Sequence, residues 1–189
     1  MGHREELLDG AKKCLLEWGY AHTTARDIVA VSGTNLASIG YHFGSKDQLL
    51  VEAMMQLMQD WGDRFSPPAL RDVQMPSRER FTGAWTRLVE QFQADPQLLI
   101  ASFEIFAQIR RTPELKTVMA EAYESIRGDF AYDFLSPDAE LQGKTLRAVS
   151  SLMLALLSGL ATQYLADPER APSVEDIVAG LRFIGKALG

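Results

Sequence analysis

The sequence predicts an all-α fold, and three observations support that prediction. Apolar residues recur at helical spacing along most of the chain, whereas no alternating Val- or Ile-rich run bounded by turns is present. Most apolar stretches follow Ser, Thr, Asp or Pro, which are residues that begin helices. The 189 residues, of which 47% are hydrophobic, can bury a sizeable core. We expect about nine helices in two domains, at residues 1–45 and 46–189.

Three helices are predicted within the first 45 residues. The first spans residues 4–18 and ends at Gly19, which can take the left-handed conformation of a helix cap. Its apolar face, expected to be buried, consists of Leu7, Leu8, Ala11, Leu15 and Trp18. The stretch TARD at 24–27 has capping-box spacing and begins a short second helix that stops at Gly33. A third helix, 35–43, follows after a turn of about three residues, which is the spacing of a helix-turn-helix.

The remaining residues predict a larger helical body. The stretch SKDQ at 45–48 begins a long helix, and the prolines between 67 and 76 mark a loop. Residues 148–166 carry no charge and are long enough to span a bilayer, but five polar residues interrupt them, so we predict a buried helix instead. The further predicted helices are 78–94, 96–111, 113–135, 139–166 and 174–188.

The charge and cysteine content exclude several classes of protein. A formal charge of −6 argues against a protein that binds polyanions over its whole surface. The first 50 residues hold five Lys or Arg against six Asp or Glu, so a DNA contact there would be local and its salt dependence shallow. Cys14 is the single cysteine, which excludes an internal disulfide. Charged residues at the N-terminus do not fit a signal peptide, so we expect a cytoplasmic protein without a membrane partner.

The segment TNLASIGYHFGSKDQLL, residues 34–50, predicts contacts with DNA. In a helix-turn-helix the second helix lies in the major groove, and residues at its N-terminus reach base edges. Base reading is predicted for Thr34, Asn35, Leu36, Ala37 and Ser38. Phosphate contacts are predicted for Thr24, Tyr41, His42 and Lys46. A structural corner is the alternative reading of this cluster, with Ile39 and Phe43 facing the core in either case.

The order of these elements resembles the tetracycline-repressor-like (TetR) family of transcription regulators. A long helix, a capped short helix, a glycine turn, a second short helix ending in YHF, and GSK before a long helix follow one another over residues 7–50. The resemblance implies phosphate contacts from Thr24, Thr34, Tyr41, His42 and Lys46, and base contacts from Leu36 to Gly40. Two positions depart from the family pattern: Gly40 stands where Tyr is usual, and Thr34 where an apolar residue is usual.

The last two predicted helices can form a dimer interface. A single reading helix gives too little specificity to find one site in a genome, so two copies are expected on double-stranded operator DNA. The interface residues that allow close approach or bury apolar surface are Ser151, Ala155, Gly159, Ile177, Leu181 and Ile184. We therefore predict a homodimer joined by a four-helix bundle, with an internal core pair as the alternative.

Aromatic and Met side chains of the body suggest a cavity for a small molecule. Such a set is ordinary core in most helical proteins. The family resemblance implies a ligand cavity, and an unidentified apolar or aromatic effector would fit this lining, with Glu104 or Gln108 as a polar anchor. Binding there would weaken the affinity for DNA. The predicted ligand-binding residues are Trp61, Trp85, Phe103, Phe106, Met119 and Tyr123.

An enzyme is not predicted. No carboxylate pair with His, nucleophile motif, HExxH sequence or Gly-rich phosphate loop occurs, so we expect neither a cofactor nor a metal. The function predicted is a sequence-specific transcriptional regulator, a dimeric repressor released by its ligand. Two alternatives stay open: a helical protein–protein adaptor, and an activator that works without a small-molecule ligand.

Overall fold

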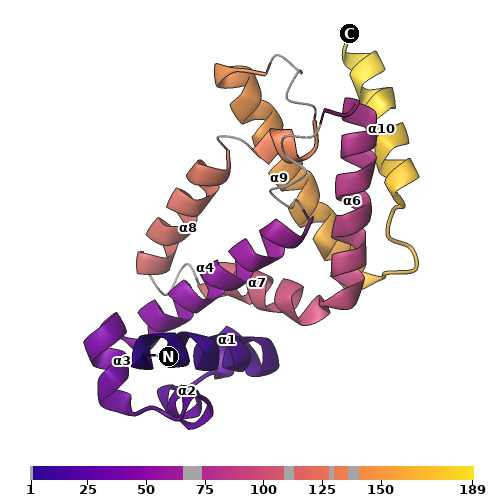
Figure 1. Ribbon diagram of the computed structural model, residues 1–189. Helices are drawn as coiled ribbons and strands as arrows, with labels where there is room; N and C mark the ends of the chain where they lie inside the picture. Colours follow the sequence, from indigo (N-terminus) through magenta and orange to yellow (C-terminus); the bar gives the residue numbers. More distant parts are fainter. Residues whose placement is uncertain (1, 66–73, 109–112, 128–129, 136–140) are drawn as a thin grey trace. The chain divides into compact units, whose positions relative to one another are not determined.

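The computed structural model describes residues 2–65, 74–108, 113–127, 130–135 and 141–189. Within these ranges the chain forms nine α-helices and one short 3-10 helix, η1, and no strand (Figure 1). The predicted all-α fold is confirmed. The elements are α1 (His3–His22), α2 (Ala25–Ser32), α3 (Leu36–Phe43), α4 (Lys46–Phe65), α6 (Ser77–Ala94), α7 (Pro96–Gln108), α8 (Pro113–Ile126), η1 (Phe130–Asp133), α9 (Gly143–Ala166) and α10 (Val174–Leu188).

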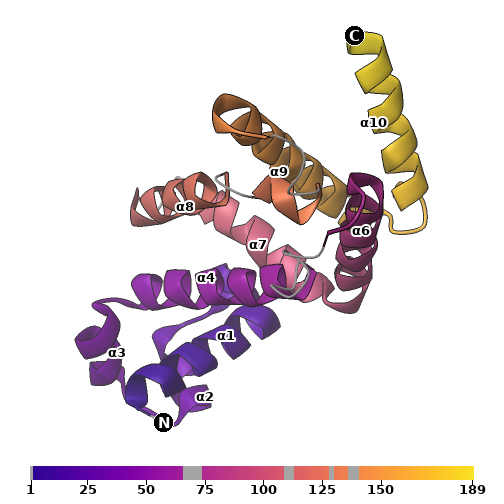
Figure 2. The ribbon, with the colours of Figure 1, turned by 45° about the horizontal axis from the view of Figure 1, so that its top comes forward.

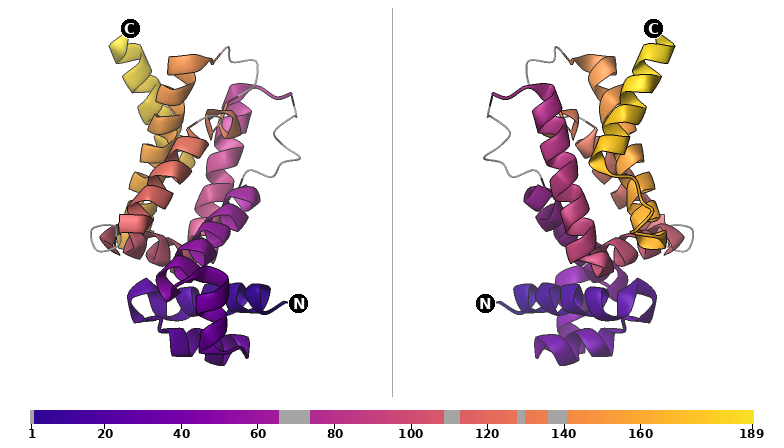
Figure 3. Two further views of the ribbon diagram at one scale, coloured as in Figure 1. Left: turned by 90° about the vertical axis from the view of Figure 1, so that its left-hand side faces the viewer. Right: turned by 90° about the vertical axis from the view of Figure 1, so that its right-hand side faces the viewer.

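The chain divides into two compact units. The first consists of Met1–Gly62 and Asp95–Val118, and the second of Asp63–Ala94 and Met119–Gly189. In the first unit, α1 packs against α2, α3 and α7 (Figure 3). In the second, α10 packs against α6, and its C-terminal end projects away from that helix (Figure 2). The boundary predicted near residue 45 stays a prediction.

The core of the first unit follows the predicted apolar face of α1, with one exception. Leu7, Leu8, Ala11 and Leu15 are buried, but Trp18 is 38% exposed, so the prediction for Trp18 is wrong. The helix does not end there: it continues to His22 across a kink at Gly19, where φ is 75°. After this change of direction the buried aromatic residue is Tyr20.

Cys14 lies fully buried in the same core. Burial raises the pKa of its thiol, and the nearby charges of Asp27 and Glu17 raise it further. Because the thiolate is the reactive form, Cys14 is a packing residue.

An aromatic cluster forms the core of the second unit. Trp85 is fully buried, with ring centroids 5.9 Å from Phe81 and 5.2 Å from Phe134, and Phe130 lies 5.2 Å from Phe134. The helix predicted over 113–135 is confirmed as far as Ile126, where α8 ends, and is wrong beyond it, because a separate 3-10 helix carries Phe130 into the cluster. A hydroxyl from α9 secures this segment, since Ser150 Oγ accepts the Ala131 N–H at 3.0 Å.

Other predicted boundaries differ less. Residues 66–73, 109–111, 128–129 and 139–140 of the predicted loop and helices lie outside the described residues. The start of α10 matches its prediction, because Ser173 and Asp176 form a capping box. The described part of the first predicted body helix also begins as expected, since Ser45 Oγ accepts the Gln48 N–H at 3.1 Å.

Helix α9 is buried along one face only. By length and composition it could cross a membrane, but a single such helix is weak evidence, because core helices of globular proteins pass the same test. In its most apolar stretch 28% of the residues are buried, so the predicted burial holds for part of the helix. Its exposed side carries Ala148, Leu152, Ala155, Gly159 and Thr162.

Candidate DNA interface

The start of α2 is fixed by a capping box at Thr24. The Asp27 N–H donates to Thr24 Oγ1 at 3.3 Å, while the Asp27 carboxylate accepts the Thr24 N–H at 2.8 Å and the Thr24 hydroxyl at 2.6 Å. These bonds, that of the hydroxyl first, lower the pKa of Asp27. The predicted capping box is thus confirmed. Since the hydroxyl proton of Thr24 is used here, the donors left for a phosphate are the first backbone amides of α2.

The turn and the start of α3 are set by Gly33 and Asn35. Gly33 has the left-handed φ of 69° that lets the chain leave α2. Asn35 is the N-cap of α3, because its side-chain oxygen accepts the Ser38 N–H at 3.1 Å. Because this oxygen is engaged in the cap, the group that Asn35 can offer to DNA is its side-chain NH₂, which carries two donors.

The exposed face of α3 is small and mostly apolar. Leu36, Ala37, Gly40 and Tyr41 are exposed, Tyr41 by 86%. Ile39 and Phe43 are buried as predicted. Ser38 is only 9% exposed, so its placement does not favour the base contact predicted for it. Sequence spacing alone did not indicate the burial of Ser38.

Three of the predicted phosphate-binding residues, Tyr41, His42 and Lys46, lie where α3 ends and α4 begins. The His42 ring is half-buried and stacks edge-on with Tyr41 at 4.8 Å between centroids. Lys46 Nζ donates to the carbonyl of Thr23 at 3.1 Å and lies 3.4 Å from Asp47. Because an ammonium has three donors, Lys46 retains N–H capacity for a phosphate oxygen.

Two residues of the helix-turn-helix, Thr34 and Arg26, change the predicted set of DNA-contacting residues. Thr34 is half-buried and shares a hydrogen bond of 2.7 Å with the Ser32 hydroxyl. Arg26, which we did not predict, is exposed on the first turn of α2 and has no hydrogen bond or ion pair to any described residue. A cation at a helix N-terminus is unfavourable for the helix dipole. A cation on the first turn of a helix, as Lys46 also is, is a signal that could have identified Arg26 from the sequence.

The predicted ligand-binding residues fall in both units. Trp61, Phe103 and Phe106 belong to the first, and Trp85, Met119 and Tyr123 to the second. Tyr123 is the member that lines a described pocket, a hollow of about 210 Å³ between α8 and α9 with Arg127, Ser151, Leu154, Ala155 and Ser158. Burial raises the pKa of Tyr123, while its hydrogen bond with Ser158 and the charge of Arg127 oppose the rise. A single cavity shared by all six residues stays a prediction.

The predicted dimer residues differ in how much surface they present. Gly159 and Ile184 are exposed, Leu181 is half-buried, and Ile177 is buried within its own chain. Ser151 and Ala155 line the pocket with α8. On α9 and α10, the large exposed apolar side chains that sequence reasoning missed are Leu152 and Phe183.

A metal site has little support in the described ranges. No group of three or more His, Cys, Asp or Glu side chains there is arranged to hold an ion. Glu104, predicted as a possible ligand anchor, instead accepts a backbone N–H from α1.

Gly40 allows a test of how closely the α3 backbone approaches DNA. A Cβ at this position would meet no atom within 4 Å. Since Ala is favoured over Gly in helix interiors, Gly40→Ala is expected to raise the unfolding free energy by about 1 kcal/mol in urea denaturation. Weaker operator binding by this more stable variant would indicate a close approach.

The matched control is Gly62→Ala in α4, where a Cβ also meets open space. It should stabilise the chain without changing DNA affinity. A gain in stability for Gly62→Ala but none for Gly40→Ala would contradict the assignment of Gly40 to an unstrained, solvent-facing helix position.

Two family models match the chain. Residues 7–53 match the model of bacterial regulatory proteins of the tetR family, and residues 76–182 match the tetracyclin repressor-like C-terminal domain. Together they cover the helix-turn-helix and most of the helical body.

Individual proteins are similar at low identity. The HTH-type nicotine-responsive transcriptional repressor HdnoR of Paenarthrobacter nicotinovorans is 25% identical over 170 residues, which are 87% of this chain and 84% of that protein. A transcriptional regulator from Rhodococcus sp. RHA1 has a TM-score of 0.71 at 19% identity and 96% coverage of both chains. The multidrug binding protein EbrR, crystallised with proflavin, has a TM-score of 0.64 at 22% identity, over 92% of this chain and 94% of that one.

Proposed function

The chain belongs to the tetracycline-repressor family of bacterial regulatory proteins, and from this premise we propose that it is a cytoplasmic, dimeric repressor released from its operator by a small apolar or aromatic molecule. Members of the family are DNA-binding transcription regulators and not enzymes. The predictions of a DNA-binding regulator and of no catalytic activity are therefore confirmed. The dimer, the ligand and the residue roles are our proposal.

The observation that carries the proposal is the exposed face of α3. Its capped N-terminus offers the amide donors of Asn35 to base acceptors and the side chains of Leu36 and Ala37 to thymine methyl groups. The phosphate backbone would be held by Tyr41, Lys46 and the exposed guanidinium of Arg26. With a single well-placed amide and otherwise apolar contacts, base reading depends strongly on methyl groups.

A dimer would set two such faces on one operator. The exposed stripe of α9 contains Leu152 and Gly159, and the outer face of α10 contains Phe183, Ile184 and Leu188. Exposed apolar side chains on two helices of one unit are typical of a surface that a second copy covers. We propose that these faces form the four-helix interface, with Ile177 as internal packing.

A small ligand is supported by relatives and by two buried polar atoms. HdnoR is named as nicotine-responsive, and EbrR holds proflavin; both compounds are small and aromatic. In α6, Trp85 Nε1 and Gln91 Oε1 are buried without a hydrogen-bond partner among the described residues. Since buried polar atoms normally have partners, a ligand acceptor beside the Trp85 N–H, or a ligand donor beside the Gln91 oxygen, would complete that atom. A coupling of about 1–3 kcal/mol between ligand and DNA is enough for regulation.

The operator should be identified by selection from genomic fragments, followed by fluorescence anisotropy with the recovered duplex. We expect a pseudo-palindrome bound by a dimer. Replacing single thymines by deoxyuridine removes only the methyl group, and should weaken binding about 3- to 10-fold at the positions that Leu36 and Ala37 contact. If the folded dimer enriches no DNA sequence, the proposed repressor function is wrong and the protein–protein adaptor alternative gains support.

Ligand release would be tested on the same complex. Proflavin is the first probe because EbrR binds it. We expect bound proflavin to lower operator affinity, and to do so less in a Trp85→Phe variant, which lacks the indole N–H. A panel of apolar aromatic compounds would be tested in the same way. If every compound that binds leaves operator affinity unchanged, release by a ligand is overturned.

A further inference from the structure

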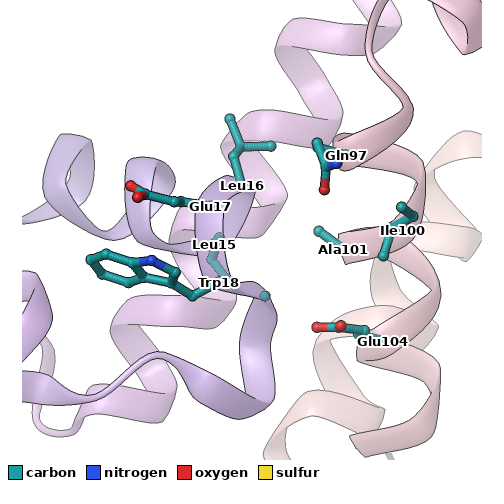
Figure 4. A pocket seen from close by; sticks show the side chains of 9 residues that line it. Leu15, Leu16, Glu17, Trp18, Gln97, Ile100, Ala101 and Glu104 are labelled. Atoms are coloured by element: carbon teal, nitrogen blue, oxygen red, sulfur yellow. The ribbon is translucent and has the colours of Figure 1, made fainter.

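A hydrogen bond joins α7 to the end of α1 within the first unit. Glu104 lies on α7, and its carboxylate accepts the backbone N–H of Tyr20 at 2.8 Å. Figure 4 shows the Glu104 carboxylate pointing from α7 toward the end of α1, at the edge of a pocket of about 140 Å³. This N–H belongs to the residue that follows the kink, so α1 itself cannot satisfy it as an unbroken helix would.

Gly19 is what allows this contact. Its φ of 75° and ψ of 174° fall in a region that is essentially reserved for glycine. A Cβ at residue 19 would also overlap the Glu104 carboxylate. The strained turn and the carboxylate thus fit each other: the glycine gives access to the N–H, and the acceptor holds the turn in place.

The Gly19 turn is connected to Lys46 by two sets of contacts. The buried Thr23 hydroxyl donates to the Gly19 carbonyl at 2.7 Å, and Lys46 Nζ donates to the Thr23 carbonyl at 3.1 Å. Lys46 Nζ also lies 5.9 Å from the ring centroid of Tyr20, within cation–π range. Every group that restrains the Lys46 ammonium, apart from its neighbour Asp47, is therefore attached to the turn that Glu104 holds.

We infer that Glu104 is a positioning residue for DNA binding, because it fixes the Gly19 turn from which Thr23 and Tyr20 hold the Lys46 ammonium toward the phosphate backbone. The inference rests on the phosphate contact proposed for Lys46. Glu104 itself does not touch DNA. Its carboxylate would even repel phosphates weakly, so its favourable effect runs against its charge.

Because the charge of Glu104 and its proposed positioning role have opposite effects on DNA binding, the direction of the change in operator affinity tests the inference. Glu104→Ala, Glu104→Gln and Glu17→Ala each remove one negative charge from the same pocket. Glu17 lines that pocket and makes no hydrogen bond to any described residue. Through charge alone all three variants would bind the operator more tightly. We expect Glu104→Ala instead to bind about tenfold more weakly as a dimer, because one hydrogen bond is lost in each subunit. Glu104→Gln keeps an acceptor oxygen and should bind at least as tightly as the wild type.

The second readout is the salt dependence of operator affinity, measured by anisotropy. Lys46→Met should reduce the slope of log K against log salt by about 2 per dimer, one phosphate contact in each subunit. Glu104→Ala should move the slope in the same direction, and should have little further effect in a Lys46→Met background. A Glu104→Ala variant that behaves like Glu17→Ala, or that loses affinity equally with and without Lys46, would overturn the inference.

Two outcomes separate this inference from the proposed function. If Lys46→Met leaves both affinity and slope unchanged, the phosphate role of Lys46 is wrong, and the inference is overturned with it. If Lys46→Met behaves as expected and Glu104→Ala does not, the inference alone is overturned. Thermal unfolding checks the fold of each variant. Should Glu104→Ala not fold, Glu104→Asp takes its place, since it keeps the charge and is too short for the Tyr20 N–H.

Discussion

Trp85→Ala is expected to lower the free energy of unfolding by about 3–5 kcal/mol. Trp85 has no exposed surface, and its ring packs against Phe81 and Phe134 in the core of the second unit. Truncation removes the ring's transfer free energy and leaves a cavity that the neighbouring rings can fill only in part. Urea denaturation followed by circular dichroism measures the loss, because removing the indole changes the fluorescence signal.

The control is Trp85→Phe. It retains an aromatic ring in the cluster and removes the Nε1–H that has no acceptor among the described residues. Its cost should stay below about 1.5 kcal/mol, since a buried unsatisfied donor is relieved as packing is lost. If Trp85→Ala were nearly as stable as the wild type, Trp85 would line an open space and not a packed core.

Phe183→Asp is expected to convert the protein to a monomer and to lower affinity for a full operator by about 10²–10⁴-fold. Phe183 is 74% exposed on α10, so a charge there costs little in the isolated chain. In a dimer the same carboxylate would be buried in an apolar interface, which is unfavourable. A monomer also lacks the second helix-turn-helix, which in a dimer is held at a high effective concentration beside the second half of the operator. Sedimentation equilibrium gives the mass, and anisotropy gives the affinity.

Phe183→Leu serves as the matched control, because it keeps an apolar side chain at the same position. It should remain dimeric and bind the operator normally. A Phe183→Asp protein that sediments as a dimer with full affinity would show that the interface lies elsewhere. The exposed face of α10 would then need another explanation.

The features that were predicted correctly from sequence depend on neighbours along the chain. A capping box joins residues three apart, so the pairing of Thr24 with Asp27 is recognisable from the residue types and their spacing alone. The same holds for the serine that begins α4 and for the helical period of α1 and α10. The all-α fold and the helix-turn-helix are sums of such local signals.

The features that were missed depend on contacts between distant residues. Trp18 has the correct period for burial, but the kink held by Glu104, more than 80 positions away, places Tyr20 in the core instead. The break after Ile126 has a local signal, Gly128, that the prediction did not use, but the aromatic cluster and the Ser150 hydrogen bond that hold η1 join distant residues. Within the site, the burial of Ser38 is a property of the packed unit, whereas the engaged hydroxyl of Thr24 belongs to the local capping box. Arg26 was missed for a different reason, since its signal, a cation on the first turn of a helix, is local.

The hidden thiol of Cys14 makes the natural sequence a convenient background for spectroscopic labelling. With its single cysteine fully buried and its pKa raised, the chain should react slowly with maleimides. A cysteine introduced at the exposed Ala30 of α2 would then be the preferred attachment site in each subunit. Spin labels there would report the distance between the two heads of a dimer, and its change when an effector is added, without any other alteration of the protein.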